Sequence, residues 1–317
     1  MKHLPARQRV FRKGWGDPDL LAANFEWAQH IPPVAAVSLE WGPARAKNGL
    51  VAREITFTSP CEQLPEAIRL TTARLLTSDP QPERLCLLMA SWNDHDYRTR
   101  TGIARMLAER GIASVMLMQP FYGNRRVEPE EVQAISNVAD FGLMGRAAVL
   151  EGRALAAALG EEGYRMGVSG YSMGGNIAAF VIATLPFPVA GAPLAAGASP
   201  APSFLNGVLG GAIDWEALGG SGKEVRERLT RYLEAIDVTR FPAPPHTATA
   251  VLLAATRDGY VPTAGSQAIH RHWQGSKMDW VNSGHAGLLR KRTDRLVAAI
   301  VDSFDRLDAW EGRDPTG

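Results

Sequence analysis

MGVSGYSMGGN, residues 166–176, joins a short apolar run to the pattern G-x-S-x-G. Residues 166–169 predict a buried strand, residues 170–175 a tight turn, and residues 176–185 a helix. Such a turn holds its serine in a strained conformation that exposes Oγ, and flanking glycines let strand and helix approach closely because no Cβ intervenes. We therefore predict that Ser172 is a nucleophile; the alternative is a glycine-rich turn without chemistry.

A serine hydroxyl becomes a good nucleophile when a neighbouring base takes its proton. Where this turn is used, the chain order is serine, acid, histidine. Asp258 follows the strand predicted over residues 249–255, and His285 lies in NSGHAG, residues 282–287, after the last predicted strand. Catalytic groups gather at the carboxyl ends of parallel strands. The sequence thus predicts Ser172 as nucleophile, His285 as general base and Asp258 as the acid that orients the histidine.

Short apolar runs alternate with longer helical patterns along most of the chain. The predicted strands are residues 85–90, 112–118, 166–169, 189–196, 249–255 and 278–282, and the predicted helices are residues 101–110, 136–159, 176–185, 266–273 and 290–307. Antiparallel strands over residues 37–40, 51–58 and 68–75 are expected ahead of them. This alternation predicts a mostly parallel central sheet with helices on both faces. Together with the strand–turn–helix around Ser172, it predicts an α/β-hydrolase fold. We expect one domain over residues 1–317.

Residues 200–240 interrupt the alternation of strands and helices. Apolar side chains lie among glycines there, including Phe204, Leu205, Val208 and Leu209, and a charged helix is predicted over residues 223–236. Insertions of this size often cover an active site. We expect a helical cap that favours an apolar acyl chain; a plain connection between strands is the alternative.

The oxyanion of an acyl-transfer intermediate needs two hydrogen-bond donors. The backbone N–H of Met173 is the first candidate, and the loop after residues 85–90 should supply the second, for which we predict Trp92, with Ser91 next. Asp94, His95 and Asp96 stand together in that loop, but three adjacent side chains rarely face one ion. We therefore expect neither a metal nor a cofactor.

Four further residues are candidates for substrate binding. Tyr171 precedes the predicted nucleophile, and Phe121, Tyr122 and Arg125 follow another strand at the same edge of the sheet. Arg125 could bind a carboxylate or an anionic head group of the substrate. Pairing of this arginine with a nearby acid, in a structural role, is the alternative.

Composition excludes several classes of partner. The net charge of +1 and the pI of about 7.9 do not favour binding to nucleic acid. Apolar runs are too short for a transmembrane segment, and no apolar h-region follows the basic residues near the start. Two cysteines, Cys61 and Cys86, make no disulfide framework. We expect a cytoplasmic protein.

Four stretches resemble the abhydrolase domain-containing eighteen family: residues 11–16 (FRKGWG), Asp94-His95 with Tyr97, residues 120–123 (PFYG), and residues 170–175. The resemblance extends from Phe11 to His285. It implies an α/β-hydrolase fold and a Ser-Asp-His triad. Eukaryotic members are linked to mitochondrial phospholipid deacylation, so the resemblance also suggests an acyl-lipid substrate. This sequence differs in having no evident targeting peptide, and Ala90-Ser91-Trp92-Asn93 stands where a glycine-rich oxyanion loop is expected.

Together these features predict a serine hydrolase that cleaves a carboxylic ester, from a small molecule or a lipid, through an acyl-enzyme. An acyltransferase would use the same triad, with an alcohol or amine in place of water. A binding protein without catalysis is the alternative from another class, and such proteins usually lack a member of the triad.

Overall fold

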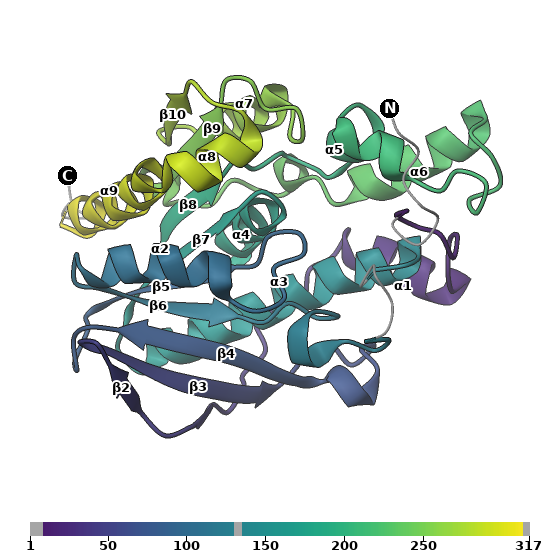
Figure 1. The fold of residues 1–317 in the computed structure, drawn as a ribbon. Coiled ribbons are helices and arrows are strands. Elements are labelled where there is room, and N and C mark those ends of the chain that lie inside the picture. Colours follow the sequence, from purple (N-terminus) through teal and green to yellow (C-terminus); the bar gives the residue numbers. More distant parts are fainter. Residues whose placement is uncertain (1–8, 130–134, 313–317) are drawn as a thin grey trace.

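A computed structural model describes residues 9–129 and 135–312, and Figure 1 shows its ribbon. The predicted domain range, 1–317, includes stretches outside the described residues, and the division into domains stays a prediction. Ten strands within the described residues form one sheet, in the order β1-β3-β4-β6-β5-β7-β8-β9-β10, with β2 paired to β3. The strands are β1 (Glu40–Trp41), β2 (Arg45–Lys47), β3 (Leu50–Thr58), β4 (Leu70–Thr77), β5 (Arg84–Met89), β6 (Ile112–Leu117), β7 (Arg165–Tyr171), β8 (Ala190–Leu194), β9 (Val251–Ala255) and β10 (Lys277–Val281).

The sheet is antiparallel at one end and parallel over the rest. β1 to β4 form antiparallel pairs, and β4 also pairs antiparallel with β6, so the first strands extend the parallel sheet at one edge. From β6 to β10 every neighbouring pair is parallel. The antiparallel strands lie at the bottom of Figure 1 and β9 and β10 at the top. The predicted fold class, a mostly parallel sheet preceded by antiparallel strands, is confirmed.

Helices pack on the sheet. The α-helices of the described residues are α1 (Pro18–Trp27), α2 (Arg98–Ala108), α3 (Val138–Glu161), α4 (Met173–Thr184), α5 (Ala201–Leu205), α6 (Lys223–Ala235), α7 (Thr263–His272), α8 (His285–Lys291) and α9 (Thr293–Glu311). The 3₁₀ turns are η2 (Glu66–Ile68), η3 (Gly123–Arg125), η4 (Val208–Ala212), η5 (Val238–Arg240) and η6 (Thr247–Thr249). α3 contacts α4, and α2 contacts α9.

Strand β5 shows why both faces of the sheet are covered. Successive side chains of a strand point to opposite faces. The side chain of Met89 lies against Gly152 of α3, whereas a Cβ on Gly167, the partner of Cys86 in the neighbouring strand, would lie 2.5 Å from the ring of Phe304 in α9. All but the first residue of β5 are buried, which is the continuous apolar pattern of a central parallel strand. α3 and α4 therefore cover one face of the sheet, and α2 and α9 cover the other.

Two predicted helices differ from the observed ones. The helix expected from residue 176 begins at Met173, because the turn is confined to Ser172 and the glycines that follow it are already helical. The helix expected over residues 290–307 is divided between α8 and α9, since Arg292 leaves the helical conformation at φ −133°. No helix in residues 9–129 and 135–312 is long and apolar enough to cross a membrane.

Candidate active site

Ser172 lies at a sharp turn between β7 and α4. Its φ of 59° and ψ of −120° are unusual for a residue with a side chain, and its N–H donates to the carbonyl of Leu194, 2.9 Å away. A Cβ on Gly170 would lie 2.3 Å from the carbonyl oxygen of Gly174, and one on Gly174 would lie 2.5 Å from the carbonyl oxygen of Met89. The two glycines of G-x-S-x-G are therefore required by close backbone contact on both sides of the serine.

Hydrogen bonds join the three residues predicted to form a triad. The Nε2 atom of His285 lies 2.9 Å from Oγ of Ser172, and its Nδ1 atom lies 2.6 Å from Oδ2 of Asp258. The Asp258 side chain is almost completely buried, and the His285 side chain keeps 12% of its surface exposed. The other carboxylate oxygen, Oδ1, accepts hydrogen bonds from the backbone N–H groups of Tyr260 and Val261, each at 2.9 Å. Both oxygens of the Asp258 carboxylate therefore have hydrogen-bond partners, and Oδ2 is the oxygen that faces His285.

Tyr171 lies against His285. Its hydroxyl donates to the carbonyl oxygen of His285 at 2.7 Å, and the two rings lie 5.0 Å apart. Burial raises the pKa of the Tyr171 hydroxyl, and the negative charge of Asp258 raises it further. Tyr171 therefore stays a neutral donor that fixes the start of α8.

A cavity of about 290 Å³ opens over Ser172 and His285. Its wall includes three of the residues predicted for binding and oxyanion stabilisation, namely Tyr171, Met173 and Trp92, together with Ser91. The segment over residues 200–240, predicted as a cap, contributes Pro200, Ser203, Phe204 and Leu209. The rings of Trp92 and Phe204 lie 6.0 Å apart at an edge-to-face angle, which makes part of the wall aromatic.

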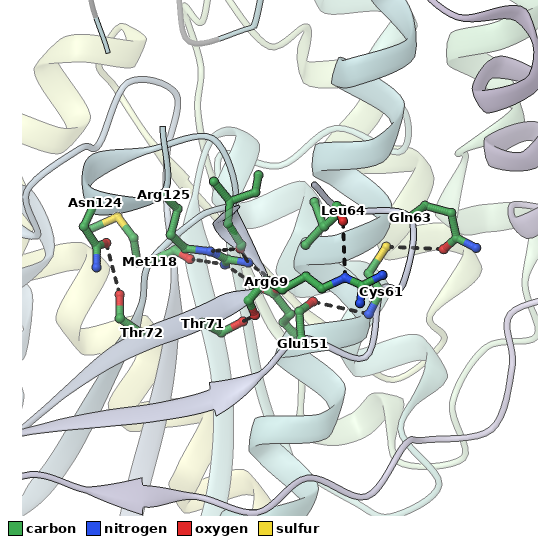
Figure 2. Close-up of polar contacts among 12 residues, drawn as sticks. Cys61, Gln63, Leu64, Arg69, Thr71, Thr72, Met118, Asn124, Arg125 and Glu151 are labelled. Atoms are coloured by element: carbon green, nitrogen blue, oxygen red, sulfur yellow. Dashed lines mark hydrogen bonds and ion pairs between the residues drawn. The ribbon is translucent and has the colours of Figure 1, made fainter. Parts of the chain in front are cut away.

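Phe121, Tyr122 and Arg125 do not line this cavity, although they were predicted to bind substrate. All three are buried. The guanidinium of Arg125 makes two hydrogen bonds to the carboxylate of Glu151, at 2.6 and 2.7 Å, and others to the carbonyl oxygens of Ile68 and Met118 (Figure 2). A guanidinium with these partners has little capacity left for a substrate anion. The position of Arg125 fits the alternative interpretation, in which this arginine pairs with a nearby acid.

Tyr122 lies under the loop that follows β5. Its hydroxyl accepts a hydrogen bond from the backbone N–H of Asn93, 3.2 Å away, and its ring lies 4.4 Å from the ring of His95. In the same loop Asp94 forms a buried ion pair with Arg100 at 2.6 Å, and the guanidinium also donates to the carbonyl oxygens of Leu88 and Leu117. The carboxylate of Asp94 is thus paired with the guanidinium of Arg100. Nowhere in the described parts of the chain do three or more His, Cys, Asp or Glu side chains gather in a way that could hold a metal ion.

Sequence reasoning missed several residues of the cavity wall. Phe141 of α3, Asn176 of α4 and Leu289 of α8 all border the cavity, and the Oδ1 atom of Asn176 accepts a hydrogen bond from Gly197. The spacing of α8 could have placed Leu289, four residues after His285 and so on the same side of the helix. Phe141 had no such signal, because α3 is apolar on most sides.

The sheet, its helices and the strand–turn–helix at Ser172 define an α/β-hydrolase. The family model described as "Alpha/beta hydrolase domain containing 18" matches residues 8–221 and 219–306, and the chain belongs to this family. The resemblance inferred from the sequence is therefore confirmed.

Solved structures of esterases are similar in fold. Acetyl xylan esterase from Paenibacillus sp. R4 aligns with a TM-score of 0.60 at 15% identity, over 90% of this chain and 95% of that chain. Acetyl xylan esterase 1 from Thermoanaerobacterium sp. JW/SL YS485 gives 0.59 at 14% identity, over 95% and 99%. A cold-adapted esterase from an Arctic intertidal metagenomic library gives 0.51 at 18% identity, over 82% and 99%. These similarities establish the fold.

Proposed function

We propose that this protein hydrolyses carboxylic esters through an acyl-enzyme formed on Ser172. The observation that supports this most strongly is the chain of two short hydrogen bonds from Ser172 through His285 to Asp258, at the floor of a cavity. A serine, a histidine within hydrogen-bond reach and a carboxylate that orients the histidine are the components of nucleophilic acyl transfer.

Acylation begins when Oγ of Ser172 attacks the carbonyl carbon of the ester. The hydroxyl proton passes to Nε2 of His285, and Asp258 stabilises the imidazolium through its hydrogen bond to Nδ1. The backbone N–H groups of Met173 and Trp92 are our candidates for donors to the oxyanion. Both residues border the cavity above Ser172. His285 then gives its proton to the alcohol oxygen as the carbon–oxygen bond breaks, and the alcohol leaves.

Deacylation repeats the same proton transfers with water. His285 removes a proton from the water, the hydroxide attacks the acyl carbon, and the proton returns to Oγ of Ser172 as the carboxylic acid departs. The family relationship and the esterase folds of the similar structures support this reaction class.

The test compares hydrolysis of p-nitrophenyl acetate and butyrate by wild type, Ser172→Ala and Ser203→Ala. Ser203 lines the same cavity and is the matched control. We expect Ser172→Ala to lose at least about 10³-fold in kcat, as happens when the nucleophile of a triad is removed, and Ser203→Ala to lose far less. Equal rates for Ser172→Ala and wild type would contradict the proposal, as would a wild-type protein that hydrolyses neither ester.

A further inference from the structure

A second, smaller hollow adjoins the cavity over Ser172, and we refer to it as the annex. Its volume is about 60 Å³, and its wall includes Trp27, Met144, Gly145, Val149, Ile177, Phe180 and Ile236. Phe141, Met173, Asn176 and Pro200 border both the annex and the larger cavity, so the two spaces adjoin at the start of α4. The annex therefore begins beside the predicted oxyanion donor Met173.

The surface of the annex is mainly hydrocarbon. Trp27, Ile177 and Phe180 are buried side chains, which close the space on their side. Arg146 also belongs to the wall, but its Nε and Nη1 atoms are buried beneath the surface and have no hydrogen-bond partner among the described residues. An apolar group that entered the annex would thus be removed from water, which is favourable.

Gly145 explains why the space exists. Phe141, Gly145 and Val149 follow one another at intervals of four residues on α3, so they lie on one side of the helix, and all three border the annex. A Cβ built on Gly145 meets no atom within 4 Å. The glycine thus leaves a gap between two larger apolar side chains.

Two other glycines of α3, Gly142 and Gly152, have a packing reason that Gly145 lacks. A Cβ on Gly142 would lie 2.1 Å from the hydroxyl of Tyr232, and one on Gly152 would lie 3.0 Å from Val181. Glycine is unfavourable inside a helix compared with alanine, and packing does not require it at residue 145. What distinguishes Gly145 is its place in the wall of the annex, where the missing side chain leaves room for a ligand.

The chemistry of the triad decides which half of an ester faces the annex. His285 must protonate the departing alcohol oxygen, so the alcohol half lies beside His285, where Ala286 and Leu289 form the wall. The acyl half then extends to the other side of Ser172. Met173 and Asn176 border both the cavity and the annex, so an acyl chain that passes them enters the annex.

We propose that the annex is the acyl-chain pocket of the esterase, and that the preferred substrates are esters of short, apolar, unbranched carboxylic acids such as butyrate and hexanoate. The inference rests on the proposed function. The annex has room for the end of a chain, on the order of four heavy atoms, because one water-sized group needs about 10–15 Å³ of such a space. Acetyl groups are too short to use the annex, and a palmitoyl chain is too long for it.

The test measures kcat/KM for p-nitrophenyl acetate, butyrate, hexanoate and palmitate with wild type and Gly145→Leu. The matched control is Gly102→Leu, because Gly102 is also inside a helix, has no atom within 4 Å of a built Cβ, and borders neither space. For wild type and the control, we expect kcat/KM to rise about fourfold for each methylene that enters the annex, and to fall at palmitate.

Gly145→Leu should fill the annex and lower the hexanoate-to-acetate ratio of kcat/KM at least about tenfold, the loss of two buried methylenes. Gly145→Ala fills less of the annex than Gly145→Leu and also stabilises the helix. It should lower the hexanoate-to-acetate ratio too, by a smaller factor. An active Gly145→Leu enzyme with the wild-type ratio would overturn the annex proposal and leave the esterase standing. Absence of Ser172-dependent hydrolysis of every ester in wild type would instead overturn the proposed function, and this inference with it.

Discussion

Ser172 occupies a backbone conformation that costs free energy. A residue with a side chain at φ 59° and ψ −120° is strained by about 1–3 kcal/mol, and such strain persists only where the surroundings enforce it. Here the enforcement comes from the hydrogen bond to Leu194 and from the glycines that let α4 begin directly above β7. The strained conformation of Ser172 could be predicted from the pattern G-x-S-x-G, because the close contacts that require the two glycines lie within the same short turn.

The histidines His285 and His246 differ in their partners. His285 has hydrogen bonds at both ring nitrogens. His246 is buried beside Trp310, and its Nε2 atom has no hydrogen-bond partner among the described residues. Burial lowers the pKa of His246 to about 4. In the unfolded chain a histidine has a pKa of about 6.5, so folding favours the neutral form of this side chain.

His246 should therefore make stability depend on pH. Between about pH 6.5 and pH 4 the unfolded chain binds a proton at this residue that the folded protein does not bind, so stability falls as the pH falls through that range. From about pH 7 to pH 5, His246 should contribute about 2 kcal/mol to the loss of stability, so the loss should be smaller by that amount in His246→Phe. Urea unfolding of both proteins at the two pH values measures it. His30→Phe, at an exposed position, is the control, and an identical pH dependence of all three proteins would contradict the expectation.

At the scale of elements, the loop after β5 and the turn η3 support each other. The loop places Trp92 in the cavity wall, and Asn93, Tyr97 and Phe121 all have positive φ, which marks both segments as tightly constrained. Tyr122 accepts the hydrogen bond from Asn93, and burial raises the pKa of its hydroxyl, which keeps it neutral. These contacts give the family motifs at residues 94–97 and 120–123 a physical role in positioning the loop that carries Trp92.

We predict that Tyr122→Phe lowers kcat for p-nitrophenyl butyrate about tenfold with little change in KM, because a misplaced oxyanion donor weakens binding of the transition state rather than of the ester. Steady-state kinetics would measure both constants. Tyr164→Phe, outside the cavity wall, is the control. A rise in KM at constant kcat would mean that Tyr122 contributes to substrate binding instead.

Elements with a clear apolar pattern were predictable, and those without one were not. β5, β6 and β9 are buried runs bounded by polar residues, and their predicted and observed positions agree within two residues. β2 was missed, because Arg45–Lys47 is exposed throughout and has no apolar residue larger than alanine. β1 begins at Glu40 rather than Val37, since its length is set by pairing with β3 and not by its own sequence.

Over the whole molecule, the ion pair of Arg125 and Glu151 joins segments that are distant in sequence. The ion pair, whose two residues are labelled in Figure 2, connects the turn after β6 to the centre of α3. The carbonyl oxygen of Ile68, at the end of η2, accepts hydrogen bonds from the same guanidinium. Both charged side chains are almost fully buried. Removing one partner would leave an unpaired buried charge, whereas the pair together satisfies most of its hydrogen-bonding groups. Arg125 thus holds η3, η2 and α3 together.

The hydrogen-bonded grouping of Ser172, His285 and Asp258 could be predicted from chain order, but the cavity could not. Each of these three residues follows a strand of a parallel sheet, and parallel strands bring their carboxyl ends to one edge. The cavity depends instead on which faces of α3, α4 and residues 200–240 meet, and a helix such as α3 that is apolar on most sides does not indicate which side faces a ligand. The positions of Phe141 and Gly145 in the walls of these spaces could therefore be recognised only from the folded structure.

The proposed reaction requires that Ser172 form a covalent bond during catalysis. Treating the protein with a fluorophosphonate and mapping the adduct by peptide mass spectrometry tests it most directly, because only a serine activated by a neighbouring base reacts rapidly with this reagent. We predict one adduct, on the peptide that contains Ser172, which forms much more slowly in His285→Ala and is absent from Ser172→Ala. Labelling at another serine, or no labelling of the folded wild-type protein, would contradict the account.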